Sequence, residues 1–297
     1  MNNWQLEEVE RDVVPSELPA GDAGAFEDLS AGRTYYELDE PSDKPLLVCI
    51  HGWSTASYAW RELRPKFQEK GYRVLTYDLY GRGYSERPPG KQSVEFFTQH
   101  LSELLERLQL DQVQLNVVGY SMGGAIAARF VSERLEQVDR LLLIAPAGTY
   151  VKLPVIRFVT RNLPRIFDPV FYALAPARLS KEFSEQAKNH LHNDAVKCAL
   201  ARQLGELNYR GYLPALLSSL KGALANSMAI EHRNIAASNV AVRAIFAGND
   251  ATITHPRAKK RFDMWNRNSV CRTFEDAGHG VAYTYVDQLI VAVEDFL

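Results

Sequence analysis

The chain has 297 residues, a length that fits one large domain or two ordinary ones. Hydrophobic residues make up 46% of it and charged residues 24%, as in ordinary soluble globular proteins. The formal net charge of −2 excludes the strongly basic composition typical of a nucleic-acid-binding protein. The cysteines have no CxxC or zinc-like spacing, so we interpret them as reduced thiols that pack as small hydrophobes: Cys49, Cys198 and Cys271.

The amino-terminal segment MNNWQLEEVERDVV is polar and acidic and lacks the apolar core of a signal peptide. No run of 18 or more apolar residues occurs, so the sequence predicts no membrane span, and we expect a cytoplasmic protein. Residues 1–30 are predicted to form an acidic, irregular extension, since several breakers interrupt it: Pro15, Pro19, Gly21 and Gly24.

Strands and helices are predicted to alternate after this extension. The apolar runs expected to form strands lie at residues 33–38, 46–50, 72–78, 113–119 and 138–146. Segments with helical spacing lie between them, at residues 57–71, 96–110 and 122–135. This alternation predicts βαβ units and an α/β fold, with a mostly parallel central sheet and helices on both faces.

The alternation stops between residues 148 and 235, where the sequence shows only helix-like segments punctuated by prolines (Pro154, Pro164, Pro169, Pro176 and Pro214). It resumes with strands at 240–248 and 269–275 and helices at about 256–266 and 281–297. We therefore predict a core of residues 31–147 and 236–297, with a helical cap of residues 148–235 inserted after the strand at 138–146, which we count as the sixth strand of the sheet. Such an insertion would lie over the carboxyl ends of the strands, where open α/β sheets bind ligands.

A nucleophile motif lies between a predicted strand and a predicted helix. The segment GYSMG at residues 119–123 matches G-x-S-x-G, and the motif requires this strand-to-helix turn. The flanking glycines allow a sharp turn, and Gly124 allows the helix to begin close to the sheet. The free amides at that helix start suit a developing oxyanion. We therefore predict that Ser121 is a nucleophile.

Residues 51–53, His-Gly-Trp, directly follow the predicted strand at 46–50. This loop can bring the amide of Trp53 to the same point as the amide of Met122, and two such donors would form an oxyanion hole. His51 precedes Ser121 in the chain and ends a buried strand, so we interpret it as structural and not as the catalytic base.

The general base is predicted to be His279, in the segment AGHG between the last strand and the last helix. Its place fits the chain order of nucleophile, acid and base. The other histidines lie in helical or insertion segments, away from the sheet edge where base and nucleophile must meet: His100, His190, His192, His232 and His255. His190 and His192 are two residues apart, which points their rings to different helix faces, so we expect surface residues and no metal.

Asp250 directly follows the strand at 240–248 and is predicted to orient His279. The rival place, after the strand at 138–144, has no carboxylate until Asp168. Glu275 and Asp276 are close to His279 in the chain, but neighbours on one short loop seldom form the in-line hydrogen bond to the imidazole.

The segments HGW, YDLYGRGYSERP, GYSMGG, AGND and AGH resemble, in order and spacing, the α/β-hydrolase superfamily over about residues 30–297, apart from the insertion. The chain is most similar to the lid-bearing esterases, monoacylglycerol-lipase-like enzymes and carbon–carbon hydrolases of that superfamily. The resemblance implies that Asp78, Gly81, Gly83 and Ser85 shape the loop after the fourth strand and take no part in the chemistry.

The chain departs from the usual pattern of that superfamily at one position, and its nucleophile sets two groups of relatives aside. Ala247 stands three residues before Asp250, where the family usually has glycine, and Gly248 comes one place later. Position 121 is serine, so the chain does not fit the relatives that use an aspartate nucleophile, such as haloalkane dehalogenases and epoxide hydrolases.

Charge is distributed unevenly along the chain. Residues 151–230 contain 11 Lys and Arg but only 5 Asp and Glu. Arg157, Arg161 and Arg165 recur every four residues among apolar side chains, so they line one helical face if Pro164 does not end the helix. Such a basic amphipathic segment can contact an anionic membrane surface. The other interpretation is that its apolar face packs on the core and the arginines are solvated.

Together these residues predict acyl transfer from a small-molecule ester of apolar or acyl type to water, with no cofactor or metal. Ser121 would attack the carbonyl and give its proton to His279, which Asp250 orients. The amides of Trp53 and Met122 would hold the oxyanion. Carbon–carbon bond hydrolysis of a diketone-like substrate, thioester or amide hydrolysis and perhydrolysis are alternatives with the same triad. A non-catalytic binding protein on a hydrolase scaffold is the alternative from another class.

Overall fold

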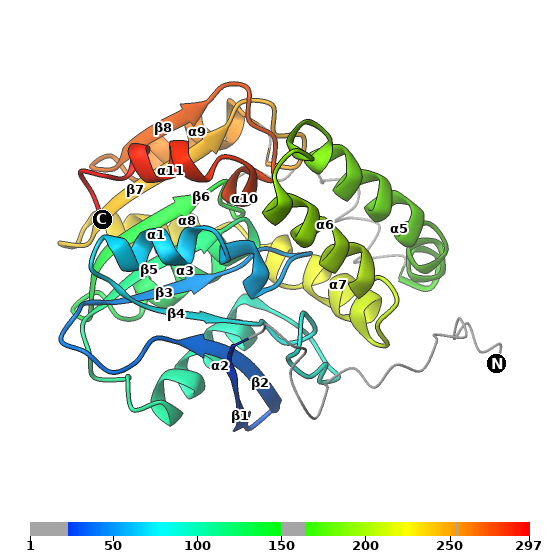
Figure 1. The fold of residues 1–297 in the computed structure, drawn as a ribbon, viewed down its shortest axis with the longest axis horizontal. Coiled ribbons are helices and arrows are strands. Elements are labelled where there is room, and N and C mark those ends of the chain that lie inside the picture. Colours follow the sequence, from blue (N-terminus) through cyan, green and yellow to red (C-terminus); the bar gives the residue numbers. More distant parts are fainter. Residues whose placement is uncertain (1–22, 150–163, 254) are drawn as a thin grey trace.

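The computed structural model describes residues 23–149, 164–253 and 255–297 (Figure 1). Its centre is an eight-stranded sheet in the order β1-β2-β4-β3-β5-β6-β7-β8. Six strands are parallel: β3 (Leu46–Ile50), β4 (Arg73–Tyr77), β5 (Leu115–Tyr120), β6 (Val138–Ile144), β7 (Ala241–Ala247) and β8 (Val270–Phe274). The α/β fold with a mostly parallel sheet is therefore confirmed.

An antiparallel hairpin extends one edge of the sheet. It consists of β1 (Ala25–Leu29) and β2 (Gly32–Leu38), and β2 pairs antiparallel with β4. β1 falls within the predicted irregular extension. Its sequence, AFEDL, has no clear strand alternation, and its pairing depends on the neighbouring edge that β2 provides. Residues 1–22 of that extension lie outside the described residues.

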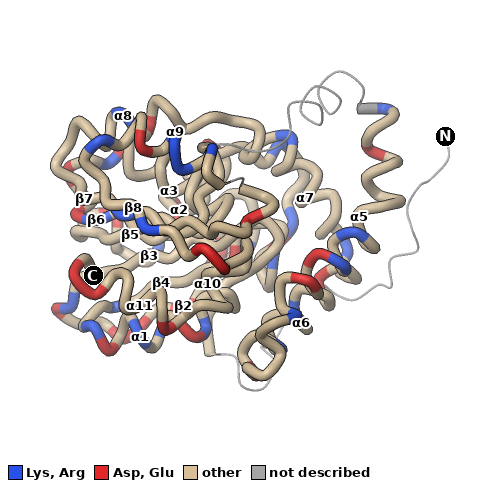
Figure 2. Tube along the Cα trace, turned by 90° about the horizontal axis from the view of Figure 1, so that it is seen from above, with Lys and Arg blue, Asp and Glu red and all other residues tan. Residues whose placement is uncertain are grey.

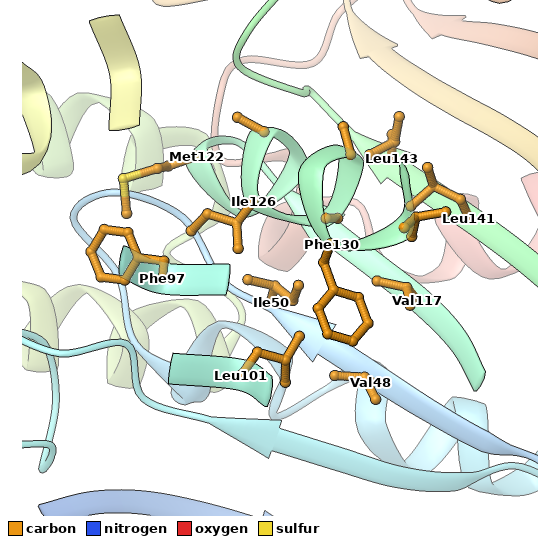
Figure 3. Packing of buried hydrophobic residues seen from close by; sticks show 14 of the residues in the cluster. Val48, Ile50, Phe97, Leu101, Val117, Met122, Ile126, Phe130, Leu141 and Leu143 are labelled. Carbon is orange, nitrogen blue, oxygen red and sulfur yellow. The ribbon is translucent and has the colours of Figure 1, made fainter. Parts of the chain in front are cut away.

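Helices cover both faces of the sheet, as predicted. One face carries α1 (Leu63–Glu69), α10 (Val281–Thr284) and α11 (Val286–Ala292). The other carries α2 (Val94–Arg107), α3 (Met122–Ser132), α8 (Ala229–Ala236) and α9 (Arg257–Trp265). Figure 3 shows Ile126 and Phe130 of α3 packed between α2 and the strand residues Val48 and Val117. This packing fixes α3, and with it the turn that precedes it.

Two predicted helices are divided in the structure. The segment 57–71 forms a 3₁₀ turn (Ser57–Trp60) followed by α1, and the last segment forms α10 and α11. In both places a continuous apolar pattern had suggested one helix, because the spacing of apolar residues does not reveal a short break.

A helical insertion follows β6. The cap helices are α5 (Pro164–Ala187), α6 (Asp194–Glu206) and α7 (Tyr212–Lys221), with 3₁₀ turns at Lys188–His190 and Ala223–Ala225. They lie together beside the sheet (Figure 1) and share a small apolar cluster that includes Leu179, Phe183 and Leu216. Although α8 falls within the predicted cap range, it packs on α3 and α9 with the core.

Helix α5 continues through Pro169 and Pro176. The prolines that punctuate the sequence therefore do not divide this helix. Its buried positions recur every four residues, at Ala175, Leu179, Phe183 and Ala187, and this stripe packs against the neighbouring helices despite the hydrogen bonds that proline removes. Pro154, Arg157 and Arg161 lie outside the described residues. In the part of the chain that the structure describes, no helix is both long and apolar enough to span a membrane.

Candidate active site

Ser121 occupies a tight turn between β5 and α3. Its backbone has φ 53° and ψ −117°, a combination that is rare and strained for a residue with a side chain. Neighbouring backbone groups hold this conformation. The amide of Ser121 donates to the carbonyl of Ile144 at 2.9 Å, and its own carbonyl accepts from the amides of Gly124 and Ala147, each at 2.9 Å. The side chain of Ser121 is thereby directed away from the sheet backbone at a fixed point.

The glycines of the motif allow close backbone approaches. A Cβ atom on Gly123 would lie 2.0 Å from the carbonyl oxygen of Ile50, and one on Gly119 would lie 2.5 Å from that of Gly123. Both distances are far below a van der Waals contact. Helix α3 therefore begins directly against the end of β3, which brings the residues after β3 close to Ser121.

His279 and Asp250 complete a hydrogen-bonded series with Ser121. The hydroxyl of Ser121 and Nε2 of His279 are 2.9 Å apart, and Nδ1 of His279 lies 2.7 Å from Oδ2 of Asp250. The other carboxylate oxygen of Asp250 accepts from the amides of Thr252 and Ile253, at 2.7 and 2.8 Å. The structure thus brings together the three residues predicted from sequence, and the backbone amides fix the carboxylate in line with the imidazole.

The electrostatic surroundings favour a protonated His279 as an intermediate. Burial disfavours the imidazolium, but the Asp250 carboxylate and its hydrogen bond, with a smaller effect of Glu182, outweigh burial and raise the pKa of His279 above its ordinary value. The phenol of Tyr120 donates to the carbonyl of His279 at 2.8 Å and holds the backbone there. The ring can therefore take a proton from Ser121 at low cost.

Glu275, Asp276 and Asp168 are not placed to replace Asp250. Glu275 and Asp276 are exposed on the loop before His279. Asp168 lies in α5, where it forms an ion pair with Lys221. Alanine at position 247, where the family usually has glycine, does not disturb the loop that carries Asp250. The backbone of Glu275 approaches at the next residue, where a Cβ on Gly248 would lie 2.4 Å from the carbonyl oxygen of Glu275.

His51 has a structural role. Its Nε2 accepts from the amide of Leu79 at 2.8 Å, which leaves Nδ1 as the donor to the carbonyl of Gly52 at 2.9 Å. Burial, above all other causes, lowers the pKa of His51 to about 3, so the ring is neutral and joins two loops.

The remaining histidines lie away from Ser121. His100 is buried against Tyr80 and bonded to the hydroxyl of Thr34 at 2.8 Å, and His232 is buried beside Phe262. His255 lies near Thr273, and the rings of His190 and His192 are 6.3 Å apart. Over residues 23–149, 164–253 and 255–297, no three His, Cys, Asp or Glu side chains are grouped as a metal site.

The loop after β3 lies beside the nucleophile. A Cβ on Gly52 would be 3.3 Å from the Cβ of Ser121, and Met122 is the first residue of α3. Trp53 is held at two points. Its carbonyl accepts from Nε of Arg82 at 2.9 Å, and its indole N–H lies 3.0 Å from both the carbonyl of Leu216 and the hydroxyl of Ser219 on α7. The two amides proposed as oxyanion donors therefore belong to rigidly held segments.

The loop after β4 has the structural role that the resemblance implied. The two oxygens of the Asp78 carboxylate accept from the amides of Ser57 and Tyr84, at 2.7 and 2.8 Å. The hydroxyl of Ser85 donates to the carbonyl of Asp78 at 2.6 Å. A Cβ on Gly83 would lie 2.0 Å from Oδ2 of Asp78, so glycine is required there.

Sequence reasoning missed two buried charged residues at the junction of core and cap. Arg82 is fully buried and donates to Trp53, to Tyr80 and to Gln92 of the core, and to Ser219 of the cap. Glu206 of α6 accepts from the amide of Gly83 at 2.8 Å and from the hydroxyl of Tyr58 at 2.9 Å. Burial lowers the pKa of Arg82 to about 10 and raises that of Glu206 to about 7. Arg82 lies within the segment YDLYGRGYSERP, but nothing local marks its contact with the cap, and Glu206 lies in no motif, because Ser219 and Gly83 are distant from them in the chain.

Comparison with known proteins assigns the fold to a family. A family model described as the alpha/beta hydrolase fold matches residues 45–284. The chain belongs to the α/β-hydrolase family. The 2-hydroxymuconate semialdehyde hydrolase of Pseudomonas sp. strain CF600 is 27% identical to this α/β-hydrolase over 283 residues, covering 91% of this chain and 92% of that protein.

Other relatives share part of the chain or the fold alone. An uncharacterized protein of Mycobacterium tuberculosis is 30% identical over 154 residues, but the match spans only 42% of that protein and 52% of this α/β-hydrolase. The crystal structure of the enol-lactonase from Burkholderia xenovorans LB400 superposes with a TM-score of 0.72 at 20% identity, covering 92% of this chain and 99% of that one. The similarity to the enol-lactonase structure shows a shared fold.

Proposed function

We propose that this α/β-hydrolase is a serine hydrolase that cleaves carboxylic esters of apolar or acyl substrates. The observation that carries the proposal is the hydrogen-bonded series from Ser121 through His279 to Asp250, with distances of 2.9 and 2.7 Å. These distances lie within the range in which a base takes a proton from a nucleophile. The backbone amides of Thr252 and Ile253 both donate to Oδ1 of Asp250, which keeps its other carboxylate oxygen oriented toward the imidazole.

The proposed reaction has two steps. In the first, Nε2 of His279 takes the hydroxyl proton of Ser121 while Oγ attacks the ester carbonyl, and the amides of Trp53 and Met122 donate to the oxyanion. His279 then gives its proton to the leaving alkoxide, which leaves an acyl-enzyme. In the second, His279 takes a proton from water, the resulting hydroxide attacks the acyl carbonyl, and the proton returns to Ser121 as the acid leaves.

A carbon–carbon bond hydrolase is the second candidate. It is favoured by the near full-length similarity to the 2-hydroxymuconate semialdehyde hydrolase. The same three residues would serve that reaction, but the leaving group would be a carbon that must take a proton, in place of an alkoxide oxygen. Thioester cleavage would also use them. The leaving group is therefore the property to measure.

The test compares wild type with Ser121→Ala on p-nitrophenyl esters of two, four, eight and twelve carbons, with a fluorophosphonate label in parallel. Turnover and labelling of the wild type alone would support the esterase. 2-Hydroxymuconate semialdehyde is assayed beside the esters, and a much higher kcat/KM for it would favour the second candidate. A well-folded wild type that neither labels nor turns over any substrate would refute the proposed triad chemistry.

We also propose that the cap contacts anionic membrane surfaces peripherally. On α5, Ile166, Val170 and Leu174 recur every four residues and are 62%, 49% and 62% exposed, and Arg165 beside them is exposed. Such a stripe can enter the lipid interface. Acidic residues are interspersed with the basic ones on α5 and α6 (Figure 2), which limits electrostatic attraction by these helices.

Flotation with phosphatidylglycerol and phosphatidylcholine vesicles at low salt tests this contact, since screening is weakest there. We expect the wild type to float with the anionic vesicles, and Leu174→Asp to float less. Absence of flotation at low salt would exclude the contact.

A further inference from the structure

The cap places a pair of polar side chains on the side of α5 that faces α10. Glu182 and Gln186 are one helical turn apart, and each immediately precedes a residue of the buried stripe, Phe183 or Ala187. The amide of Gln186 donates to the Glu182 carboxylate at 3.3 Å, and its carbonyl oxygen accepts from the hydroxyl of Tyr283 at 2.9 Å. The pair is therefore bound to the core through Tyr283.

Tyr283 connects this pair to the catalytic end of the sheet. It lies in α10, which begins directly after His279 and Gly280. The rings of Tyr283 and Tyr120 are edge to face at 6.5 Å, and the ring of Tyr120 lies 5.6 Å from that of His279. Glu182 thus lies on the cap opposite the loop that carries the base.

The charge of Glu182 influences two residues of the segment that carries the base, His279 and Tyr283. Next to burial it is the largest influence that raises the pKa of Tyr283, and together with Asp250 it favours the imidazolium of His279. The imidazolium compensates Asp250 during the reaction, whereas Glu182 adds a second negative charge from the cap, beside the loop that carries His279. The charge of Glu182 therefore makes the potential at Ser121 more negative than it would be without this carboxylate.

We propose that Glu182 sets the charge preference of the site, so that it accepts neutral and cationic esters and disfavours esters with an anionic group in the acyl chain. The inference rests on the proposed esterase function and names its substrate class. Two unit charges about 10 Å apart at an effective dielectric constant of about 20 alter a rate by roughly tenfold, which is the size of effect to be expected.

The experiment measures kcat/KM for three p-nitrophenyl esters of similar acyl length: the neutral butyrate, the anionic monoester of glutaric acid and the cationic 4-(trimethylammonio)butyrate. In Glu182→Gln we expect the anionic-to-neutral ratio to rise about tenfold and the cationic-to-neutral ratio to fall by a similar factor. Glu185→Gln is the matched control, because Glu185 is exposed on the same helix, and both ratios should stay within about twofold of wild type.

The ratios decide the inference. If Glu182→Gln changes all three rates in the same proportion, or if Glu185→Gln moves the ratios equally, Glu182 does not select charge and the inference fails. Failure of the proposed function itself has a different signature, because the wild type would then hydrolyse none of the three esters and would not take the fluorophosphonate label.

Discussion

Arg82 donates a hydrogen bond from Nε to the carbonyl oxygen of Trp53 at 2.9 Å. The same guanidinium donates to the hydroxyl of Ser219 at 2.5 Å, and the indole of Trp53 also donates to that hydroxyl. The loop that carries the proposed oxyanion donor is therefore joined to the cap helix α7 through one buried cation. This arrangement makes the position of the Trp53 amide depend on how the cap is seated.

Substitution of Arg82 by lysine should impair the chemical step more than substrate binding. A lysine amine cannot reproduce the planar fork that reaches Trp53, Gln92 and Ser219 together. We expect kcat for p-nitrophenyl butyrate to fall about tenfold, with KM changed less than threefold, because part of the oxyanion stabilisation is lost. Arg107→Lys is the control, since Arg107 is an exposed residue at the end of α2. Equal kinetic losses in the two variants would argue against the positioning role.

Replacement of Asp250 by asparagine should reduce kcat by about three to four orders of magnitude. An asparagine cannot both accept from Nδ1 of His279 and satisfy the amides of Thr252 and Ile253 with carboxylate oxygens. Because Asp250 raises the pKa of His279, its loss lowers that pKa. The acidic limb of the residual pH–rate profile should then move to lower pH. Asp276→Asn, at an exposed position on the loop before His279, should keep full activity. A limb that moves to higher pH would contradict this account.

The elements that the sequence predicted well are those encoded by local patterns. β3 is an unbroken apolar run that is fully buried, and the turn at Ser121 is marked by the glycines around it. β1 was not predicted, because its five residues show no alternation of apolar and polar side chains and form a strand only by pairing with β2. The continuity of α5 through its prolines likewise depends on tertiary packing of the stripe that includes Leu179 and Phe183.

The site residues divide in the same way. Ser121, His279 and Asp250 each end a strand or follow one, so the order of elements alone brought them to one edge of the sheet. Arg82 and Glu206 each join the core to the cap through a partner more than a hundred residues away in the chain, Ser219 for Arg82 and Gly83 for Glu206. No periodicity or motif in one sequence encodes such pairs.

The close packing at Gly123 predicts a large loss of stability on substitution. A Cβ there would lie 2.0 Å from the carbonyl oxygen of Ile50, so Gly123→Ala must shift α3 away from β3. We expect the free energy of unfolding in urea to fall by about 3 kcal/mol or more. Gly205→Ala in α6 is the matched control, since nothing lies within 4 Å of its Cβ position. That variant should gain about 0.5–1 kcal/mol. Similar stability of the two variants would show that the turn is looser than described.

Glu206 should make stability depend on pH. Burial, its largest influence, raises the pKa of Glu206 from the ordinary value of 4.5 to about 7, so the folded state favours the neutral acid. Stability is therefore lost as pH rises from about 4.5 through 7, by up to about 3 kcal/mol. Glu206→Gln resembles the neutral acid and does not titrate. Asp78, whose pKa burial raises to about 6, titrates in both proteins, and its charge also raises the pKa of Glu206, so the difference includes the repulsion between the two carboxylates. We measure the free energy of unfolding in urea at pH 5, 6, 7 and 8 and expect the value for Glu206→Gln to rise relative to that of wild type as pH rises. If this difference stays flat or falls, the carboxylate is ionised without cost at the junction of core and cap.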